Sequence, residues 1–469
     1  LIYLFILIGI GFYKSSKVKT QSDFAVAGRS LTPWVLVGTM LATWMGTGSI
    51  LGNAGKTYDT GMAALILPIG SILGIILLTQ IAGKVRSFEK YTVPEILGER
   101  FGPGARLLSV VALVIAYMVI VSYQYNAGGA VLHTVLTNDA GVSLISVKTG
   151  TIIAAVFIIA YTMLAGLVSV AYTDVANGVI ILLSFIIAIP ILLVEAGGFS
   201  GMAESFASMG KNSHMNFWGV YSTMDIINFC LPPFLLIMGD ANMYQRFFAS
   251  KSAEGAKFAT KVLIGAVAAA ELMIIFSAWV ASSMIPDAEV GKYVLIYASH
   301  KFLPTFLGAI MMTTIVGIII STADSFLLVP ATTLMRDVYL NYINPNADEK
   351  KIVLLSRLLV LALGIVAYIV SLGFAKSAGF FERALYAYTI YGAAITPTLV
   401  AALFWRGATK AGAVASIITG TVTTLLWKEA AFIKNIIPVN IYNNMDEVLP
   451  AITLSIVSLI LVSLATKKD

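Results

Sequence analysis

Long apolar runs, separated by short polar segments, follow one another along almost the whole chain. A helix needs about 20 residues to cross the roughly 30 Å apolar core of a lipid bilayer, and most of these runs are that long. They predict an all-α integral membrane protein with about thirteen transmembrane helices. The predicted spans cover residues 1–13, 32–57, 61–83, 105–135, 147–171, 174–197, 222–247, 258–284, 304–329, 353–373, 382–405, 409–428 and 448–466.

The first run, at residues 1–13, is too short to cross a bilayer, and the chain opens on Leu1. We therefore expect a truncated first helix there. No basic segment precedes the run, so it does not have the pattern of a signal peptide.

Two of the predicted spans contain residues that interrupt a helix. The second span carries Gly46 and Gly48 beside hydroxyl-bearing neighbours, and each glycine weakens a helix by about 1 kcal/mol. The seventh span carries Pro232, Pro233 and then Gly239, and a proline removes a backbone hydrogen bond. Unwound backbone at membrane depth is stable where it is buried in protein or lines a cavity, although membrane helices also tolerate Gly and Pro without unwinding.

The two interruptions lie five spans apart, and this odd offset would invert the second half of the chain relative to the first. Paired interruptions in two halves are typical of transporters built from inverted repeats. We predict a single transmembrane domain over residues 1–469, with a first repeat at 32–197, an inverted second repeat at 222–405 and two C-terminal helices at 409–466.

The composition supports a membrane protein, because 58% of the residues are hydrophobic, only 12% are charged and the mean hydropathy is +0.90. The net charge of +6 does not indicate a nucleic-acid partner, since no basic run with interleaved aromatic residues occurs. Cys230, the single cysteine, excludes an internal disulfide and a cysteine metal cluster. The lipid bilayer is the expected environment.

Basic residues favour one orientation, because positively charged loops are retained in the cytoplasm. With the N-terminus outside, about 21 of the 30 Lys and Arg residues, Arg246 among them, fall on the cytoplasmic side and about 9 on the other. We predict a multi-pass protein of the cell (plasma or inner) membrane with its N-terminus outside and its C-terminus in the cytoplasm.

The predicted ninth span carries a stripe of oxygen-bearing groups. Ile318, Ser321, Thr322 and Ser325 share one helix face by their spacing. Sodium is a hard cation that suits oxygen ligands, so hydroxyls and free carbonyls could form a sodium cage. The same hydroxyls could equally bond to their own helix or pack helices together.

Several separated motifs occur in order along the chain: GLVSVAYTD at 166–174, YQRF at 244–247, STADS at 321–325 and RDVY at 336–339. With Arg29 and the segment 39–58, they resemble the sodium:solute symporter family, which includes sodium:proline, sodium:galactose and high-affinity choline transporters. The similarity runs from about residue 23 to about residue 425. It implies a five-plus-five inverted-repeat fold, similar to that of the leucine transporter, and alternating access driven by a sodium gradient.

The resemblance also implies site residues. The main sodium site would use backbone carbonyls and hydroxyls, carried over to Ala42, Met45, Ile318, Ser321 and Thr322. A second sodium ion, or the release path, would use Asp174 and Ser325. Asp174 lies near the cytoplasmic end of its predicted span, where solvation or helix capping would also explain it. Asp324 stands where some members of the family have a serine.

Six further residues are candidates for contact with the solute: Trp44, Gly48, Ser49, Tyr123, Asp240 and Glu271. The face of Trp44 would attract an ammonium group by roughly 0.5–2 kcal/mol. Carboxyl groups inside a membrane are costly and usually functional. Asp240 and Glu271 could each bind solute, carry a proton or stay neutral in a hydrogen bond.

The sequence therefore predicts a sodium-coupled symporter that imports a small polar organic solute, such as an amino acid or a choline-like amine. A proton-coupled transporter or exchanger of the same fold, with Glu271 or Asp240 as the proton carrier, is the first alternative. An ion channel or a non-transporting sensor is the second, although no ring of charges typical of a channel filter is evident. We expect no enzyme, because neither HExxH nor GxSxG occurs.

Overall fold

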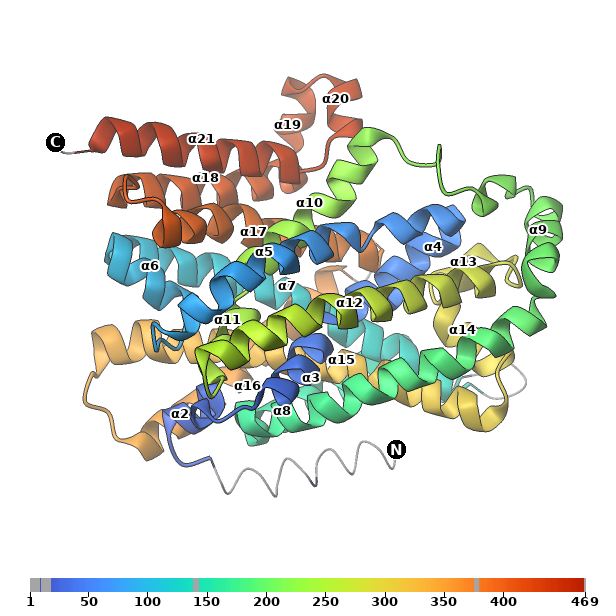
Figure 1. The fold of residues 1–469 in the computed structure, drawn as a ribbon, viewed down its shortest axis with the longest axis horizontal. Coiled ribbons are helices and arrows are strands. Elements are labelled where there is room, and N and C mark those ends of the chain that lie inside the picture. The colour runs from blue at the N-terminus through green and yellow to red at the C-terminus, as the bar shows by residue number, and fades with distance from the viewer. Residues whose placement is uncertain (1–8, 10–17, 138–142, 375–378, 468–469) are drawn as a thin grey trace.

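The computed structural model describes residues 9, 18–137, 143–374 and 379–467, which fold into helices joined by short loops (Figure 1). The predicted first span lies almost wholly outside the described residues. The helices in chain order are α2 (Gln21–Val26), η1 (Ala27–Arg29), α3 (Pro33–Trp44), η2 (Gly48–Asn53), α4 (Ala54–Thr60), η3 (Gly61–Ile66), α5 (Ile69–Arg86), α6 (Val93–Phe101), α7 (Pro103–Val135), α8 (Val147–Glu195), α9 (Gly198–Ser208), η4 (Asn212–Met215), α10 (Thr223–Gly239), α11 (Ala241–Ala249), α12 (Ala253–Ser282), α13 (Ala288–Gly291), α14 (Val294–Lys301), α15 (Thr305–Thr333), η5 (Leu334–Ile343), α16 (Glu349–Phe374), α17 (Phe380–Phe404), α18 (Lys410–Glu429), α19 (Ala431–Ile436), α20 (Val439–Asn444) and α21 (Val448–Thr466).

Within the described part of the chain, 10 helical segments are long and apolar enough to cross a membrane, and a bent pair of helices brings the number to 11. They correspond to the predicted spans from the second to the eleventh and to the last one. Helix α18 occupies the position of the twelfth predicted span, but its middle is rich in threonine and it is not among the 11. The all-helical membrane fold is confirmed, and the count of thirteen stays a prediction.

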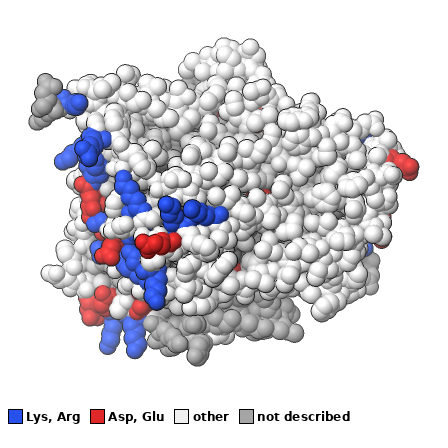
Figure 2. Space-filling model, in the orientation of Figure 1, with Lys and Arg blue, Asp and Glu red and all other residues white. Residues whose placement is uncertain are grey.

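Charged side chains gather at one end of the molecule, beside α6 and the C-terminal end of α21, and the broad middle is almost free of charge on the face shown (Figure 2). The long helices run roughly parallel to the line that joins the two ends (Figure 1). This distribution is what a bilayer requires, because charge is costly in the hydrocarbon layer and cheap in the flanking water.

Several helices begin at a polar residue whose side chain caps the first turn. Thr92, Ser146, Ser252 and Thr409 each accept a hydrogen bond from the backbone N–H three residues further on. Such caps satisfy one of the free N–H groups at a helix start and stabilise it by about 1 kcal/mol. They fix where α6, α8, α12 and α18 enter the bundle.

The second predicted span is broken, as the sequence indicates. Helix α3 ends at Trp44, Met45 has an extended backbone with ψ of 90°, and the chain resumes with η2 at Gly48. The two halves, α3 and the segment from Gly48 to Ile66, are bent by 52°. The prediction of an interruption at the two glycines is confirmed.

The seventh predicted span is interrupted at Asp240, beyond its prolines. Helix α10 continues through the proline pair at 232–233 and ends at Gly239, and α11 begins directly after Asp240, whose ψ is 112°. The carbonyl of Gly239 accepts a hydrogen bond from the Tyr391 hydroxyl of α17 at 2.8 Å. Side chains of neighbouring helices therefore satisfy the backbone at this break, as a membrane interior demands.

The boundary between the fifth and sixth spans differs from the prediction. It lies at Gly166, whose φ of +58° and ψ of 173° interrupt α8, and not between residues 171 and 174. Glycine adopts positive φ without steric penalty, which explains why the chain turns there. Asp174 consequently lies about two turns inside the second half of α8, away from the helix end.

Helix α15 runs through the middle of the bundle, and its residues from Ile318 onwards are buried. It packs against α7, α8, α16 and α3, while α17 packs against α7, α10 and η2. This arrangement brings the STADS motif of α15 beside the break that follows α3. Helices α18 and α21 pack against each other through small residues, with Gly412 against Ser463.

Candidate sodium and substrate sites

Oxygen atoms converge where the break after α3 meets α15. The hydroxyl of Thr322 lies 3.1 Å from the carbonyl oxygen of Met45 and 3.4 Å from that of Ala42, and the hydroxyl of Ser321 lies 3.3 Å from the Ala42 oxygen. All four residues are buried. Because the helix is interrupted here, these carbonyls can take a partner outside their own helix. Ile318 lies one turn before Thr322 on α15 and is also buried.

Gly46 allows the broken helix to approach α15 this closely. A Cβ atom at this position would lie 2.8 Å from Cγ2 and 3.0 Å from Oγ1 of Thr322. On the other side of the break, the Oε1 atom of Gln124 on α7 accepts hydrogen bonds from the backbone N–H of Thr47, at 3.3 Å, and from its hydroxyl. Gln124 thus satisfies the unwound backbone, a role that the sequence did not suggest.

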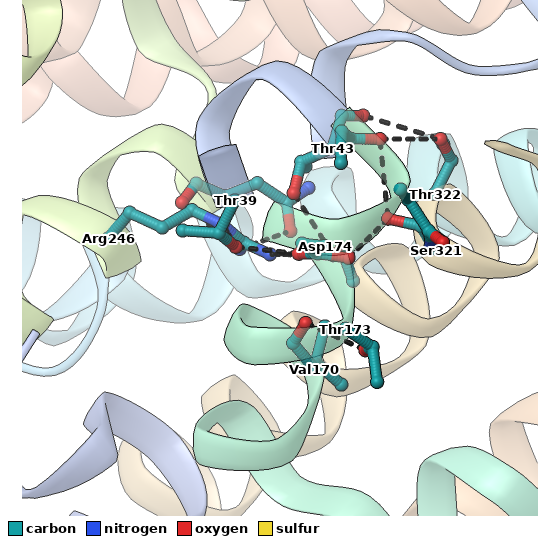
Figure 3. A network of polar contacts seen from close by, with 12 residues as sticks. Thr39, Thr43, Val170, Thr173, Asp174, Arg246, Ser321 and Thr322 are labelled. Carbon is teal, nitrogen blue, oxygen red and sulfur yellow. Dashed lines mark hydrogen bonds and ion pairs between the residues drawn. The ribbon is translucent and has the colours of Figure 1, made fainter. Parts of the chain in front are cut away.

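Asp174 of α8 lies at the centre of a buried polar network next to these oxygens (Figure 3). Its carboxylate accepts hydrogen bonds from the hydroxyl of Thr39, at 2.6 Å, and from that of Ser321. The guanidinium of Arg246 lies 3.8 Å from the same carboxylate and donates to the Ser325 hydroxyl at 2.6 Å. Neither side chain of the ion pair is exposed at all.

The structure excludes an alternative that the sequence left open for Asp174, and it corrects the expectation for Arg246. Asp174 is neither solvated nor a helix cap, because its carboxylate is enclosed by three helices. Arg246 does not lie in a cytoplasmic loop, because its side chain is buried against Asp174. The Asp174 carboxylate supplies the counter-charge that a buried guanidinium requires. The YQRF motif marked Arg246 as a residue of interest, but a motif alone does not show whether a side chain is buried.

The structure brings Ser321, Ser325 and Asp174 together, and the guanidinium of Arg246 lies against both Asp174 and Ser325. Asp324 is directed elsewhere: its carboxylate accepts a hydrogen bond from the Thr162 hydroxyl of α8 at 2.5 Å. A positively charged side chain therefore lies against Asp174 and Ser325, the two residues predicted to hold a second cation.

A small inner cavity of about 30 Å³ lies beside the break, on the side facing α12 and α17. Four of the predicted solute contacts line it: Trp44, Gly48, Ser49 and Glu271. Further lining residues that the sequence did not indicate are Asn53, Leu67, Pro68, Ser71, Phe229, Pro233, Phe381, Ala384, Leu385 and Tyr388. No sequence signal could have found most of them, because the packing of distant helices brings them together.

Polar and aromatic groups of this cavity are arranged in pairs. Glu271, which is buried, accepts hydrogen bonds from the Ser49 hydroxyl at 2.6 Å and from the Asn53 amide at 2.9 Å. The ring of Trp44 stacks on that of Tyr388 with centroids 6.1 Å apart. Among the described residues, the cavity therefore offers one carboxyl group and four aromatic rings, two of which, Trp44 and Tyr388, are stacked on each other.

Two predicted solute contacts do not line the inner cavity. Tyr123 is buried within α7. Asp240 is buried at the break after α10, where it accepts hydrogen bonds from the Tyr117 hydroxyl and from the backbone N–H of Asn242. Its second carboxylate oxygen has no hydrogen-bond partner among the described residues.

A larger space of about 690 Å³, which we call the outer vestibule, is lined by residues of η2, α4 and α17. Helix α4 lies away from the charged end of the molecule (Figures 1 and 2). Phe381 lines both spaces. Among the described residues, six charged ones line the vestibule: Lys56, Asp59, Lys292, Glu382, Arg383 and Lys428. The vestibule and the inner cavity therefore adjoin at Phe381.

This chain resembles known proteins over most of its length. The model of the sodium:solute symporter family matches residues 24–420. The osmoregulated proline transporter OpuE of Bacillus subtilis is 24% identical, over 100% of this chain and 94% of that protein. A sodium/proline symporter of Staphylococcus aureus is 25% identical, over 100% of this chain and 92% of that protein.

Solved structures share the fold at low sequence identity. A sodium-coupled sialic acid symporter in a substrate-bound, outward-open state superposes with a TM-score of 0.80 at 15% identity, over 99% of this chain and 96% of the other. A nucleobase-cation-symport-1 family transporter superposes with a TM-score of 0.59 at 13% identity, over 96% of each chain. Both likenesses extend over nearly the whole chain, as the predicted five-plus-five fold requires.

Proposed function

This chain belongs to the sodium:solute symporter family, and on that premise we propose that it imports a small zwitterion of the proline type. As a member of the family it is a sodium-coupled membrane transporter and not an enzyme. The observation that carries the proposal is the convergence of carbonyl and hydroxyl oxygens at the break after α3, next to a cavity that contains a carboxyl group and aromatic faces.

Sodium would bind between the carbonyls of Ala42 and Met45 and the hydroxyls of Ser321 and Thr322, with the Ile318 carbonyl as a further ligand. Neutral oxygens suit a hard monovalent cation. Each hydroxyl has one donor and two acceptor positions, so Ser321 can donate to Asp174 and still offer a lone pair to sodium. This supports Asp174 as the group that orients Ser321.

The position of Arg246 favours one main sodium ion. A guanidinium that contacts both Asp174 and Ser325 supplies the positive charge that a second sodium would otherwise bring. We propose that Asp174 and Ser325 serve sodium through Ser321 and through the release path, without a second bound ion.

The solute would occupy an enlarged form of the inner cavity. Both curated relatives described above carry names that specify proline. A cation is attracted to an aromatic face, and Trp44 stacked on Tyr388 beside Glu271 would suit the ammonium end of such a solute. The present cavity has room for little more than water, so Phe381 or its neighbours must move when solute enters.

The proposed orientation has the N-terminus outside and the C-terminus in the cytoplasm. The excess of basic residues on one side and the gathering of charge at one end support it (Figure 2). In this orientation the outer vestibule faces the outside. Solute and sodium would enter there and leave at the charged end by alternating access.

A thermal-shift screen of the purified protein tests the proposal. We expect L-proline to raise the melting temperature in sodium chloride and not in potassium chloride, while choline and galactose have no comparable effect. At about 100 times its dissociation constant, a ligand stabilises a protein by about 2.7 kcal/mol, which such an assay detects. Equal stabilisation in both salts, or none by any zwitterion, would contradict the proposal.

A further inference from the structure

A lysine and two phenylalanines separate the outer vestibule from the inner cavity. Lys56 lines the vestibule, Phe229 lines the inner cavity and Phe381 lines both. The two rings meet edge to face, with centroids 5.3 Å apart. The ammonium group of Lys56 lies 4.7 Å from the centroid of Phe229 and 5.6 Å from that of Phe381. We refer to these three residues as the lysine-aromatic partition.

The ammonium group of Lys56 lies against the two rings and within electrostatic range of Asp59 and Asp446. Among the described residues Lys56 makes no salt bridge, and its near neighbour Asp59 on α4 is exposed. A cation is attracted to a ring face, but a full negative charge at a similar distance attracts it more strongly. A carboxylate that enters the vestibule would therefore compete with the two rings for Lys56.

The two spaces on either side of the partition differ in charge. Among the described residues that line the vestibule, four are basic and two are acidic, a formal excess of two positive charges by difference. In the part of the chain that the structure describes, Glu271 is the only charged residue that lines the inner cavity. A zwitterion would thus be oriented on entry, with its ammonium end towards Glu271 and its carboxylate towards Lys56.

We propose that Lys56 determines specificity for solutes that carry a carboxylate. On entry of such a solute, Lys56 leaves the two rings to pair with the carboxylate, and Phe381 is then free to move and admit the ammonium end to the inner cavity. An amine without a carboxylate gives Lys56 no partner, so the partition stays closed to it. The inference rests on the proposed function, since it concerns which part of the solute is recognised.

The test compares L-proline with L-prolinamide, which keeps the ring and the amine but replaces the carboxylate by a neutral amide. Binding of both compounds is measured in sodium chloride for the parent protein and for Lys56→Gln, Lys56→Met and Lys56→Arg. Lys292→Gln is the matched control, because Lys292 is an exposed lysine of the same vestibule that does not contact the partition rings. Lys56→Met keeps an unbranched apolar stem against the rings and so separates charge from packing.

We expect the parent to bind L-proline at least about tenfold more tightly than L-prolinamide, as a charge pair with the carboxylate would give. Lys56→Gln and Lys56→Met should lose this preference, Lys56→Arg should restore most of it, and Lys292→Gln should retain it. Loss of binding for both compounds alike, or retention of the preference in Lys56→Gln and Lys56→Met, would overturn the role of Lys56 and leave the proposed function standing. If the parent binds neither compound in sodium, both proposals fail.

Discussion

At the scale of single residues, the proposed sodium site depends on two neighbouring hydroxyls with different surroundings. Ser321 donates its proton to Asp174, whereas Thr322 lies closest to the Met45 carbonyl. The Asp174 carboxylate would therefore not contact sodium itself but one of its ligands, Ser321, and Arg246 partly neutralises the charge of that carboxylate. In the proposed site, sodium would therefore meet neutral oxygen ligands, with no carboxylate in direct contact.

Replacing either hydroxyl should weaken sodium binding. Hydrogen bonds and related contacts to charged groups are worth about 1.5–3 kcal/mol, so Ser321→Ala and Thr322→Ala should each raise the sodium concentration for half-maximal uptake by about tenfold or more. Thr332→Ala is the matched control, since Thr332 is buried on the same helix and its hydroxyl has no partner among the described residues. Unchanged sodium dependence in both site variants would refute the assignment.

Asp174→Asn distinguishes two roles for this carboxylate: direct binding of a second sodium ion, or action through Ser321 and the release path. The variant leaves the Arg246 guanidinium buried without its counter-charge, and breaking a buried pair in this way costs about 3–5 kcal/mol. We expect a lower melting temperature and a weaker sodium response, with the Hill coefficient for sodium unchanged near one. The double variant with Arg246→Gln should recover part of the lost stability.

A fall of that coefficient from near two towards one in Asp174→Asn would instead establish a second sodium ion at Asp174. Transport at the parent rate with the same sodium dependence and the same melting temperature would remove Asp174 from the mechanism altogether.

At the scale of elements, the proposed sites lie at breaks in the helices, and the sequence located some of these breaks but not others. Two glycines among hydroxyl-bearing residues correctly located the break after α3. The proline pair did not locate the second break, because α10 passes through it and ends at Gly239, directly before Asp240. Gly166 is the first residue of the GLVSVAYTD motif, but the break was not assigned to it, because a single glycine in an apolar run is common and only its positive φ reveals the turn.

Gly46→Ala tests whether the break must lie against α15. Alanine normally favours a helix over glycine by about 1 kcal/mol, so local propensity would predict no harm. Here the new Cβ would lie 2.8 Å from Cγ2 of Thr322, which forces the two elements apart. We expect sodium-dependent stabilisation to be lost while the protein remains folded. Gly55→Ala, whose Cβ would meet its nearest atom at 3.6 Å, should behave as the parent.

If Gly46→Ala kept the parent's sodium response, the close approach of the break to Thr322 would not matter for the ion. If both variants lost it, the effect would reflect glycine content and not the contact with α15.

At the scale of the whole molecule, the sequence predicted the class of protein, the fold and most of the spans, because each follows from local hydropathy and from motifs in order. It indicated Trp44, Ser49 and Glu271, which line the inner cavity, but not Asn53 and Tyr388, which line it too. These residues come together only when α3, α12 and α17 pack, and no local sequence pattern predicts that packing. The orientation in the membrane remains a prediction.

Labelling of single cysteines tests that orientation. In a Cys230→Ser background, Trp218→Cys places a thiol on the exposed segment before α10, and Arg406→Cys places one on the exposed turn between α17 and α18. With the C-terminus in the cytoplasm, an impermeant maleimide should label position 218 on intact cells and position 406 only after lysis. The reverse pattern would invert the proposed topology.

The central claim is that a sodium gradient drives solute across the membrane. Its most direct test is the uptake of radiolabelled L-proline into liposomes that contain the purified protein. The account predicts accumulation above the external concentration when sodium is higher outside, and none when potassium replaces sodium or when only a proton gradient is imposed. Accumulation driven by a proton gradient in the absence of sodium would contradict the account and would direct attention to the buried carboxyl groups of Asp240 and Glu271 as proton carriers.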